Sequence, residues 1–130
     1  MEHRDTFQVE LSCPAKFGLQ ACLSKQVLHD RLAGYNLTAG TVVVNDRQDL
    51  QQALDTLGSP VWLRCAEGPR GRGSIVVEHV DDGVFWMDYW RRRDAADDVW
   101  LAHEYLPGRT LNWTSIWNQG ELVAAACGER

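Results

Sequence analysis

The sequence lacks any apolar run that approaches the length of a membrane span, and its first residues are polar rather than typical of a secretion signal. It also lacks an excess of basic residues, because 13 lysines and arginines stand against 18 aspartates and glutamates, a formal net charge of −5. Sequence-independent nucleic-acid binding depends on basic surface. We therefore expect a cytoplasmic protein with neither a membrane nor a nucleic-acid partner.

A metal-binding pattern is also missing. No CxxC pair occurs among Cys13, Cys22, Cys65 and Cys127, and the four histidines do not fall at the spacings of zinc ligands. We expect no metal to be held by this chain. Cys65 and Cys127 lie in apolar, strand-like runs, which favours buried free thiols in a reducing compartment.

What is present suits one soluble globular domain: 130 residues, of which 45% are apolar and 24% charged. Hydrophobic periodicity and turn residues predict an α+β order of elements rather than repeated βαβ units. The expected elements are a strand at 7–11, a helix from Ser24, a strand at 41–44, a helix at 45–58, strands at 61–65 and 74–78, a helix from Asp81 or Asp82, a strand at 99–106, and a hairpin of 111–117 with 122–127.

Polar residues and glycines mark the expected helix ends. Ser24 is a candidate N-cap, and Gly34 a candidate C-cap, of the first of these helices. Asn45 or Asp46 can cap the next helix, and Asn45 with Gln48 resembles a capping box.

The segment 64–74 carries three glycines and three arginines between two apolar strands. Glycines let backbone N–H groups converge on an anion, and arginine adds a fork that matches phosphate oxygens. The spacing is not a Walker A loop, since Ser74 stands where that motif needs lysine, and not GxGxxG, since Val76 holds the third glycine position. Anion binding and a polar hairpin tip without a ligand both remain open.

The order of these elements resembles the ATP-grasp fold. The run from Gly58 to Arg64 is similar to the family's "LG-x-P-hydrophobic-K/R" strand, and residues 104–108 resemble its hinge. Arginine in place of lysine at position 64 is similar to the large subunit of carbamoyl-phosphate synthase. The resemblance implies a partial ATP-grasp fold: a small antiparallel sheet with helices plus the start of the second lobe. Residues 1–23 would be a lead-in segment, and 24–130 a nucleotide-binding domain with a truncated C-terminal lobe.

The resemblance also implies a set of ATP-binding residues. Lys25 matches the basic residue of the family's "DK" pair that reaches the nucleotide phosphates, and Arg64 matches the second phosphate-binding residue. The lid over the phosphates would contain Gly68, Arg70, Gly71, Arg72, Gly73 and Ser74. A solvated lysine at a helix start and a merely exposed strand-end arginine are the alternatives for Lys25 and Arg64.

Residues 103–106 match the hinge beside adenine. The resemblance implies that the Glu104 carbonyl and the Leu106 N–H pair with the base edge, with Tyr105 between them. His103 stands where many members carry a glutamate that contacts the amino group of the base. A half-buried strand histidine is the alternative.

Departures from the family pattern bear on activity. Thr110 stands where many members hold the ribose with glutamate, an aspartate common near Thr114 is missing, and the Mg²⁺ ligands would follow Arg130. Phosphoryl transfer needs metal ions to neutralise developing charge. We therefore expect no turnover by this chain alone, and Mg²⁺ only in a complete enzyme. That enzyme would activate a small carboxylate or bicarbonate-like substrate as an acyl phosphate. The alternatives are a non-catalytic ATP-binding or interaction domain and a structural segment that binds nothing.

The expected hairpin is strongly apolar. Leu111, Trp113 and Trp117 alternate onto one face, and 122–127 is apolar throughout. An uncovered hairpin offers both an apolar patch and unpaired edges to another chain. We expect self-association through it.

Overall fold

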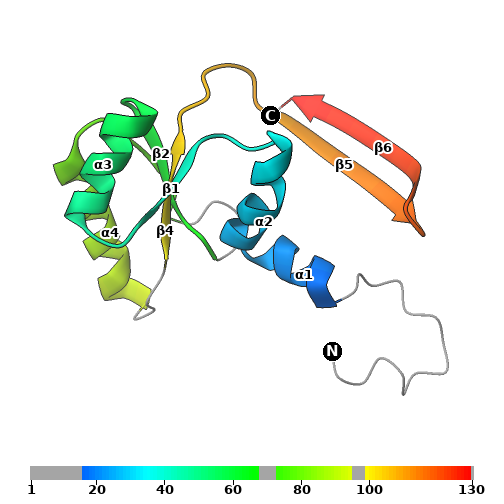
Figure 1. Cartoon of the computed structure of the whole chain (residues 1–130), viewed down its shortest axis with the longest axis horizontal. Helices are drawn as coiled ribbons and strands as arrows, with labels where there is room; N and C mark the ends of the chain where they lie inside the picture. The colour runs from blue at the N-terminus through cyan, green and yellow to red at the C-terminus, as the bar shows by residue number, and fades with distance from the viewer. Residues whose placement is uncertain (1–15, 68–72, 95–98, 130) are drawn as a thin grey trace.

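The computed structural model describes residues 16–67, 73–94 and 99–129, and it contains two antiparallel sheets (Figure 1). The four-stranded sheet has the order β1-β4-β2-β3, and the second sheet pairs β5 with β6. The strands are β1 (Thr41–Val44), β2 (Val61–Cys65), β3 (Ile75–Val77), β4 (Trp100–Glu104), β5 (Leu111–Asn118) and β6 (Glu121–Glu129). The helices are α1 (Lys16–Leu23), α2 (Lys25–Leu32), α3 (Arg47–Leu57) and α4 (Val80–Asp94). The α+β class is confirmed, whereas the strand expected at 7–11 lies outside the described residues.

The core lies between the four-stranded sheet and the two helices α3 and α4, which cover one of its faces (Figure 1). Alternate residues of β2 are buried there, as the period of a strand requires: Val61, Leu63 and Cys65. Trp100 of β4 and Met87 of α4 fill the same layer. The residues of β2 between the buried ones, among them Trp62, therefore point to the other face.

Helix ends agree with the predictions in part. Ser24 caps α2, with its hydroxyl accepting from Val27 N at 3.4 Å, and Asp46 caps α3 by accepting from the backbone N of Gln48 and Asp49. The proposed Asn45–Gln48 pair is wrong, because the Asn45 backbone and side-chain nitrogens both donate to Asp49 Oδ2 at 2.9 Å.

Several other boundaries differ from the sequence prediction; the strand expected at 99–106, for example, is the shorter β4, Trp100–Glu104. Gly34 is not a C-cap: α2 ends at Leu32, a 3₁₀ turn of residues 33–35 follows, and Asn36 takes the left-handed conformation with φ 58°. Asparagine tolerates that region, so the chain needs no glycine there. Helix α4 begins at Val80, slightly ahead of the predicted Asp81 or Asp82. Helix α1 was not predicted at all.

Gly73 and Gly83 are fixed by close packing. Gly73 has φ +70°, and a Cβ there would lie 2.8 Å from Cys65 Sγ and 3.2 Å from the Trp100 ring. A Cβ on Gly83 of α4 would overlap Leu50 of α3. At both positions the absent side chain lets neighbouring elements approach each other.

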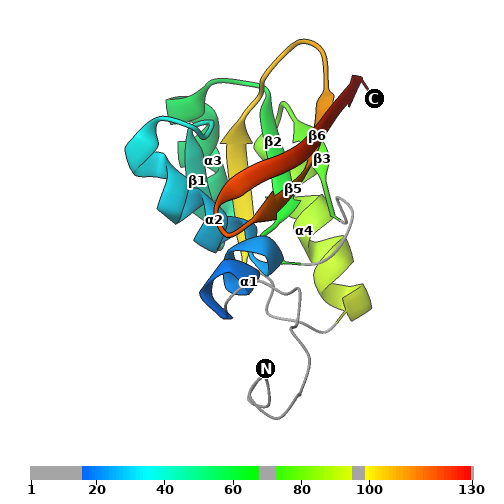
Figure 2. The same ribbon diagram turned by 90° about the vertical axis from the view of Figure 1, so that its right-hand side faces the viewer.

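The β5–β6 hairpin is exposed along almost its whole length, as predicted. Its turn has Gln119 at φ 50° and Gly120 at φ 88°, and Trp113 and Trp117 are 62% and 58% exposed. Cys127 is therefore exposed rather than buried, although Cys65 is buried as expected. Figure 2 shows the hairpin passing in front of the four-stranded sheet, on the side away from α3 and α4.

None of the helices in the described ranges has the length and hydropathy needed to cross a membrane.

Candidate functional site

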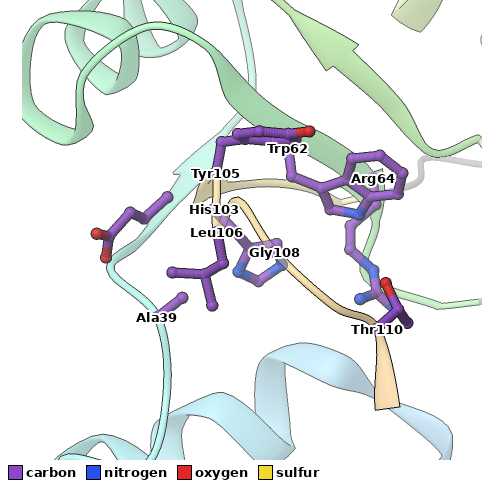
Figure 3. A pocket seen from close by; sticks show the side chains of 9 residues that line it. Ala39, Trp62, Arg64, His103, Tyr105, Leu106, Gly108 and Thr110 are labelled. Carbon is purple, nitrogen blue, oxygen red and sulfur yellow. The ribbon is translucent and has the colours of Figure 1, made fainter. Parts of the chain in front are cut away.

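A cavity of about 490 Å³ opens on the face of the four-stranded sheet that α3 and α4 leave uncovered (Figure 3). Strand pairing explains which side chains meet there. Trp62 of β2 and Thr41 of β1 both stand opposite His103 of β4, and opposite residues of an antiparallel pair share a face. Arg64, two residues after Trp62, falls on the same face. The cavity is lined by Ala39, Trp62, Arg64, His103, Glu104, Tyr105, Leu106, Gly108 and Thr110.

A second cavity of about 290 Å³ adjoins the first along Ala39, Arg64 and His103. Helix α2 and the segment after it form its outer wall. It is lined by Lys25, Leu28, His29, Leu32, Leu37, Thr38, Ala39, Thr41, Arg64 and His103. The two cavities together therefore collect Lys25, Arg64 and His103, three predicted site residues from three separate elements.

Lys25 is held at the end of β2. Its backbone N donates to the Ala66 carbonyl at 3.0 Å, and its Nζ donates to the same oxygen at 3.3 Å. Burial lowers the pKa of Lys25, and the positive charge of Arg64 lowers it further, while Cys65 and Glu67 act in the opposite direction. Two like charges in one partly buried place favour an anion between them.

Arg64 is about half-buried, and burial lowers its pKa. Its Nε is buried and has no hydrogen-bond partner within the described part of the chain. Removing a charged donor from water without a partner is unfavourable, and a ligand oxygen would relieve that cost. An arginine that was merely exposed at a strand end would keep its water.

His103 is a half-buried strand histidine and at the same time part of both cavity walls. Its Nδ1 lies 2.7 Å from Thr41 Oγ1. Burial, followed by the charges of Arg64 and His29, lowers the pKa of His103 to about 4, so that the ring is neutral at pH 7. Its Nε2 is buried and has no partner among the residues that the structure describes.

The predicted hinge borders the larger cavity. Glu104 ends β4; its N donates to the Gly40 carbonyl at 2.9 Å, and its Oε2 accepts from Gly40 N at 3.4 Å. Gly40 thus engages both the backbone and the side chain of Glu104. Tyr105 and Leu106 follow and are 40% and 66% exposed. Glu104, Tyr105 and Leu106 all line the cavity, but their pairing with a base edge stays a prediction.

The structure describes only two residues of the predicted lid, Gly73 and Ser74. Gly68, Arg70, Gly71 and Arg72 lie outside the described residues. Gly73 packs against Cys65 and Trp100, and its carbonyl accepts from Trp86 Nε1 at 2.8 Å. Ser74 follows with a buried hydroxyl that has no partner in the described ranges. Neither Gly73 nor Ser74 lines either cavity, so Gly73 has a packing role and the lid role of this segment stays a prediction.

Sequence reasoning missed several cavity residues. Trp62 carried a usable signal, because strand alternation places it on the same face as Arg64. Ala39 and Thr41 carried no such signal in the sequence. The pairing of β1 with β4 sets Thr41 opposite His103, and Ala39 lies two residues before Thr41. Thr110, noted as a departure from the family pattern, does line the cavity.

Within the described ranges, no group of three or more His, Cys, Asp or Glu side chains could hold a metal ion.

Comparison of the sequence with models of protein families and with curated proteins gave no match. Solved structures do match. The structure is similar to D-alanyl-alanine synthetase A from Vibrio cholerae O1 biovar eltor, with a TM-score of 0.68, 13% identity, and coverage of 91% of this chain and 36% of that one. It is also similar to a RimK domain protein ATP-grasp from Sphaerobacter thermophilus, with a TM-score of 0.61, 16% identity, and coverage of 82% of this chain and 40% of that one.

These likenesses confirm that the chain adopts part of the ATP-grasp fold, as the sequence predicted. The chain spans 36% and 40% of the two matching structures. Neither of them is a carbamoyl-phosphate synthase, so the closer resemblance to that type stays a prediction.

Proposed function

We propose that this chain is the ATP-binding part of an ATP-grasp ligase. The observation that carries the proposal is Arg64, which lines both cavities and whose buried Nε has no hydrogen-bond partner among the described residues, with Lys25 on the wall of the second cavity. Phosphate oxygens are the natural partners of such a pair of cations. Both residues also match phosphate-binding positions in the sequence resemblance to the ATP-grasp family.

The larger cavity suits the base. Its volume of about 490 Å³ falls within the range of small-molecule sites, roughly 300–1,000 Å³. Trp62 offers an aromatic face, and Tyr105 and Leu106 add apolar area at the link to the hairpin. With the base there, the triphosphate would extend past Arg64 toward Lys25. The residues present therefore fit ATP by both shape and charge.

The reaction of the complete enzyme is a proposal that rests on the resemblance. It would transfer the γ-phosphoryl group of ATP to a small carboxylate or to bicarbonate, as in enzymes of the carbamoyl-phosphate synthase type, and then pass the acyl group to an amine. Mg²⁺ would neutralise the developing charge on the phosphates. The described residues offer no acidic cluster for it, so we assign none of them to the metal.

Thr110 favours a second candidate, a non-catalytic ATP-binding or interaction domain. It lines the cavity at the place where the resemblance calls for the ribose-holding glutamate. A hydroxyl holds the ribose less strongly than a carboxylate does. Phosphate release by the product of the whole gene, with ATP and Mg²⁺, distinguishes the two: steady release supports the ligase, and ATP binding without release supports the second candidate.

Replacing Arg64 with alanine tests ATP binding. We expect the affinity measured by calorimetry to fall by about 1.5–3 kcal/mol, the value of a hydrogen bond to a charged group. Arg92→Ala is the matched control, because Arg92 is exposed on α4, which covers the opposite face of the sheet. Equal ATP affinity for the wild type and both variants, all folded by circular dichroism, would remove the basis of the proposal.

A further inference from the structure

A chain of hydrogen bonds runs from the backbone to His103. The Thr41 hydroxyl donates to the Ala39 carbonyl at 3.0 Å, and the same oxygen lies 2.7 Å from His103 Nδ1. A hydroxyl has one proton and can donate only once. Both contacts form together only if Thr41 gives its proton to Ala39 and accepts a proton from Nδ1–H of His103.

This arrangement decides what the other ring nitrogen can do. A neutral imidazole with its proton on Nδ1 has a bare Nε2, which can only accept. That Nε2 is buried and has no partner within the described residues. A buried acceptor without a donor is costly, so the site gains from a ligand that brings an N–H group to it.

The structure assigns to Thr41 the role of a positioning residue that fixes His103 as a hydrogen-bond acceptor, and we propose that the site thereby selects 6-aminopurine over 6-oxopurine nucleotides. The inference rests on the proposed function, since it concerns the base of the nucleotide in the larger cavity. An adenine amino group donates to Nε2. The oxygen of hypoxanthine or guanine would place a second acceptor against it, and two facing acceptors repel.

Access to Nε2 requires one local change. The atom is shielded from water, so a ligand reaches it only when a neighbouring side chain shifts. Leu106 lines the same cavity and is 66% exposed, which leaves it free to change rotamer (Figure 3). The backbone that holds Thr41 and His103 is paired in the sheet and need not move.

The competing assignment for the same atoms is Arg64. Its buried Nε–H is a donor without a partner in the described part of the chain, and its charge is close enough to lower the pKa of His103. If Nε2 accepted from Arg64, then Thr41 and His103 would orient the phosphate-binding guanidinium rather than the base. The two assignments predict different ligand selectivity, which makes them separable.

The experiment combines imidazole ¹⁵N NMR with binding of three probes: ATP, inosine triphosphate and inorganic triphosphate. In the free wild-type protein at neutral pH, we expect His103 Nδ1 to be protonated and Nε2 to be bare. ATP should bind about five- to tenfold more tightly than inosine triphosphate, the range expected for one neutral hydrogen bond. Thr41→Val should bring that ratio close to one and weaken ATP more than it weakens inorganic triphosphate. Thr41→Ser, which keeps the hydroxyl, should restore it.

Each other result overturns the inference. A protonated Nε2 in the free protein contradicts the hydrogen-bond chain. An ATP-to-inosine-triphosphate ratio that Thr41→Val leaves unchanged removes the base contact, and equal weakening of all three probes assigns the chain to Arg64. The Arg64→Ala variant separates this failure from a failure of the proposed function: if Arg64→Ala weakens ATP but Thr41→Val leaves the ratio unchanged, only the further inference falls.

Discussion

At the scale of single residues, the site is built from polar groups that the fold leaves partly buried and incompletely paired. Arg64 Nε and His103 Nε2 are a donor and an acceptor, both without a partner in the described ranges. Lys25 is held against a backbone carbonyl rather than extended into water. Folding around such groups sacrifices stability, which is a common feature of binding sites.

His103 makes a prediction about stability and pH. Its pKa is lowered to about 4 in the folded chain, from 6.5 for the ordinary group. Between these values the unfolded chain binds a proton that the folded chain does not, so the free energy of unfolding falls as pH falls from 6.5 to about 4. The slope is below about 1.4 kcal/mol per pH unit, because the ring is partly exposed and solvent screens it.

Urea unfolding at several pH values between 5 and 7.5, for the wild type and His103→Gln, measures this contribution. We expect the variant to lose the downward slope. The pKa values of Asp49, Asp81 and Glu129 are also lowered, but their contribution to stability is lost at lower pH, as pH falls below the ordinary values of 3.8 for aspartate and 4.5 for glutamate. An identical slope for both proteins above pH 5 would show that His103 is not buried neutral.

The individual site residues were predictable to different degrees, for a physical reason. Arg64 could be predicted because the resemblance to the ATP-grasp strand implies a basic residue there, next to a segment rich in glycine and arginine, and Trp62 follows from alternation along the same strand. The Thr41–His103 contact could not, because 62 residues separate the two and no local period records which strands pair. Long-range strand order is a property of the whole fold.

At the scale of elements, the close approach of α3 and α4 depends on one glycine, Gly83, which has no side chain to separate the two helices. Gly83 of α4 faces Leu50 of α3 and Val77 of β3, and all three are buried. Glycine weakens a helix by about 1 kcal/mol relative to alanine, so its presence inside α4 requires a packing reason. The overlap that a Cβ would create supplies that reason.

We predict that Gly83→Ala destabilises the protein by about 1–3 kcal/mol, because forced overpacking outweighs the gain in helix propensity. Thermal or urea unfolding measures the change. Gly34→Ala is the control: nothing lies within 4 Å of a Cβ at Gly34, so we expect a neutral or slightly stabilising effect. If both substitutions stabilise the protein, the two helices can separate freely and the packing argument fails.

The sequence predicted helices and strands correctly where the periodicity of apolar residues was strong. Helix α3 has its buried side chains at Leu50, Ala53 and Leu54, which is the spacing that its sequence shows. Helix α1 was missed because its first turn has no acidic residue and its last turn no basic one. The C-terminal end of α2 was misplaced because Gly34 is a typical C-cap residue, whereas the left-handed conformation falls at Asn36.

At the scale of the whole molecule, the two sheets are unequal. The buried apolar residues found in the described ranges all lie between Val44 and Ala102, and none lies in the hairpin. The hairpin is joined to the first sheet through residues 105–110. An Arg109–Glu129 ion pair, with contacts of 2.6 and 2.8 Å, holds its open end together. It therefore adds exposed apolar area but little to the core.

Removing the hairpin tests this division. We predict that a chain ending at Pro107 keeps a free energy of unfolding within about 1 kcal/mol of the full chain, since the buried apolar residues of the described ranges all precede it. We also predict that light scattering at high concentration shows less self-association for this chain and for Trp113→Lys in the full chain. Asn112→Lys, on the opposite face of β5, is the matched charge control. A strongly destabilised truncation, or equal association of all variants, would mean that the hairpin is packed.

A core that is complete before the chain reaches its second sheet has a consequence for how such genes change. Recombination at the codons for residues 105–110 would exchange everything that follows without disturbing the residues that hold the first sheet together. Insertions there would lengthen a surface link and leave both sheets intact. One side of this boundary can thus be inherited as a unit while the other diverges, so that related genes keep the first sheet with its core and acquire different second halves.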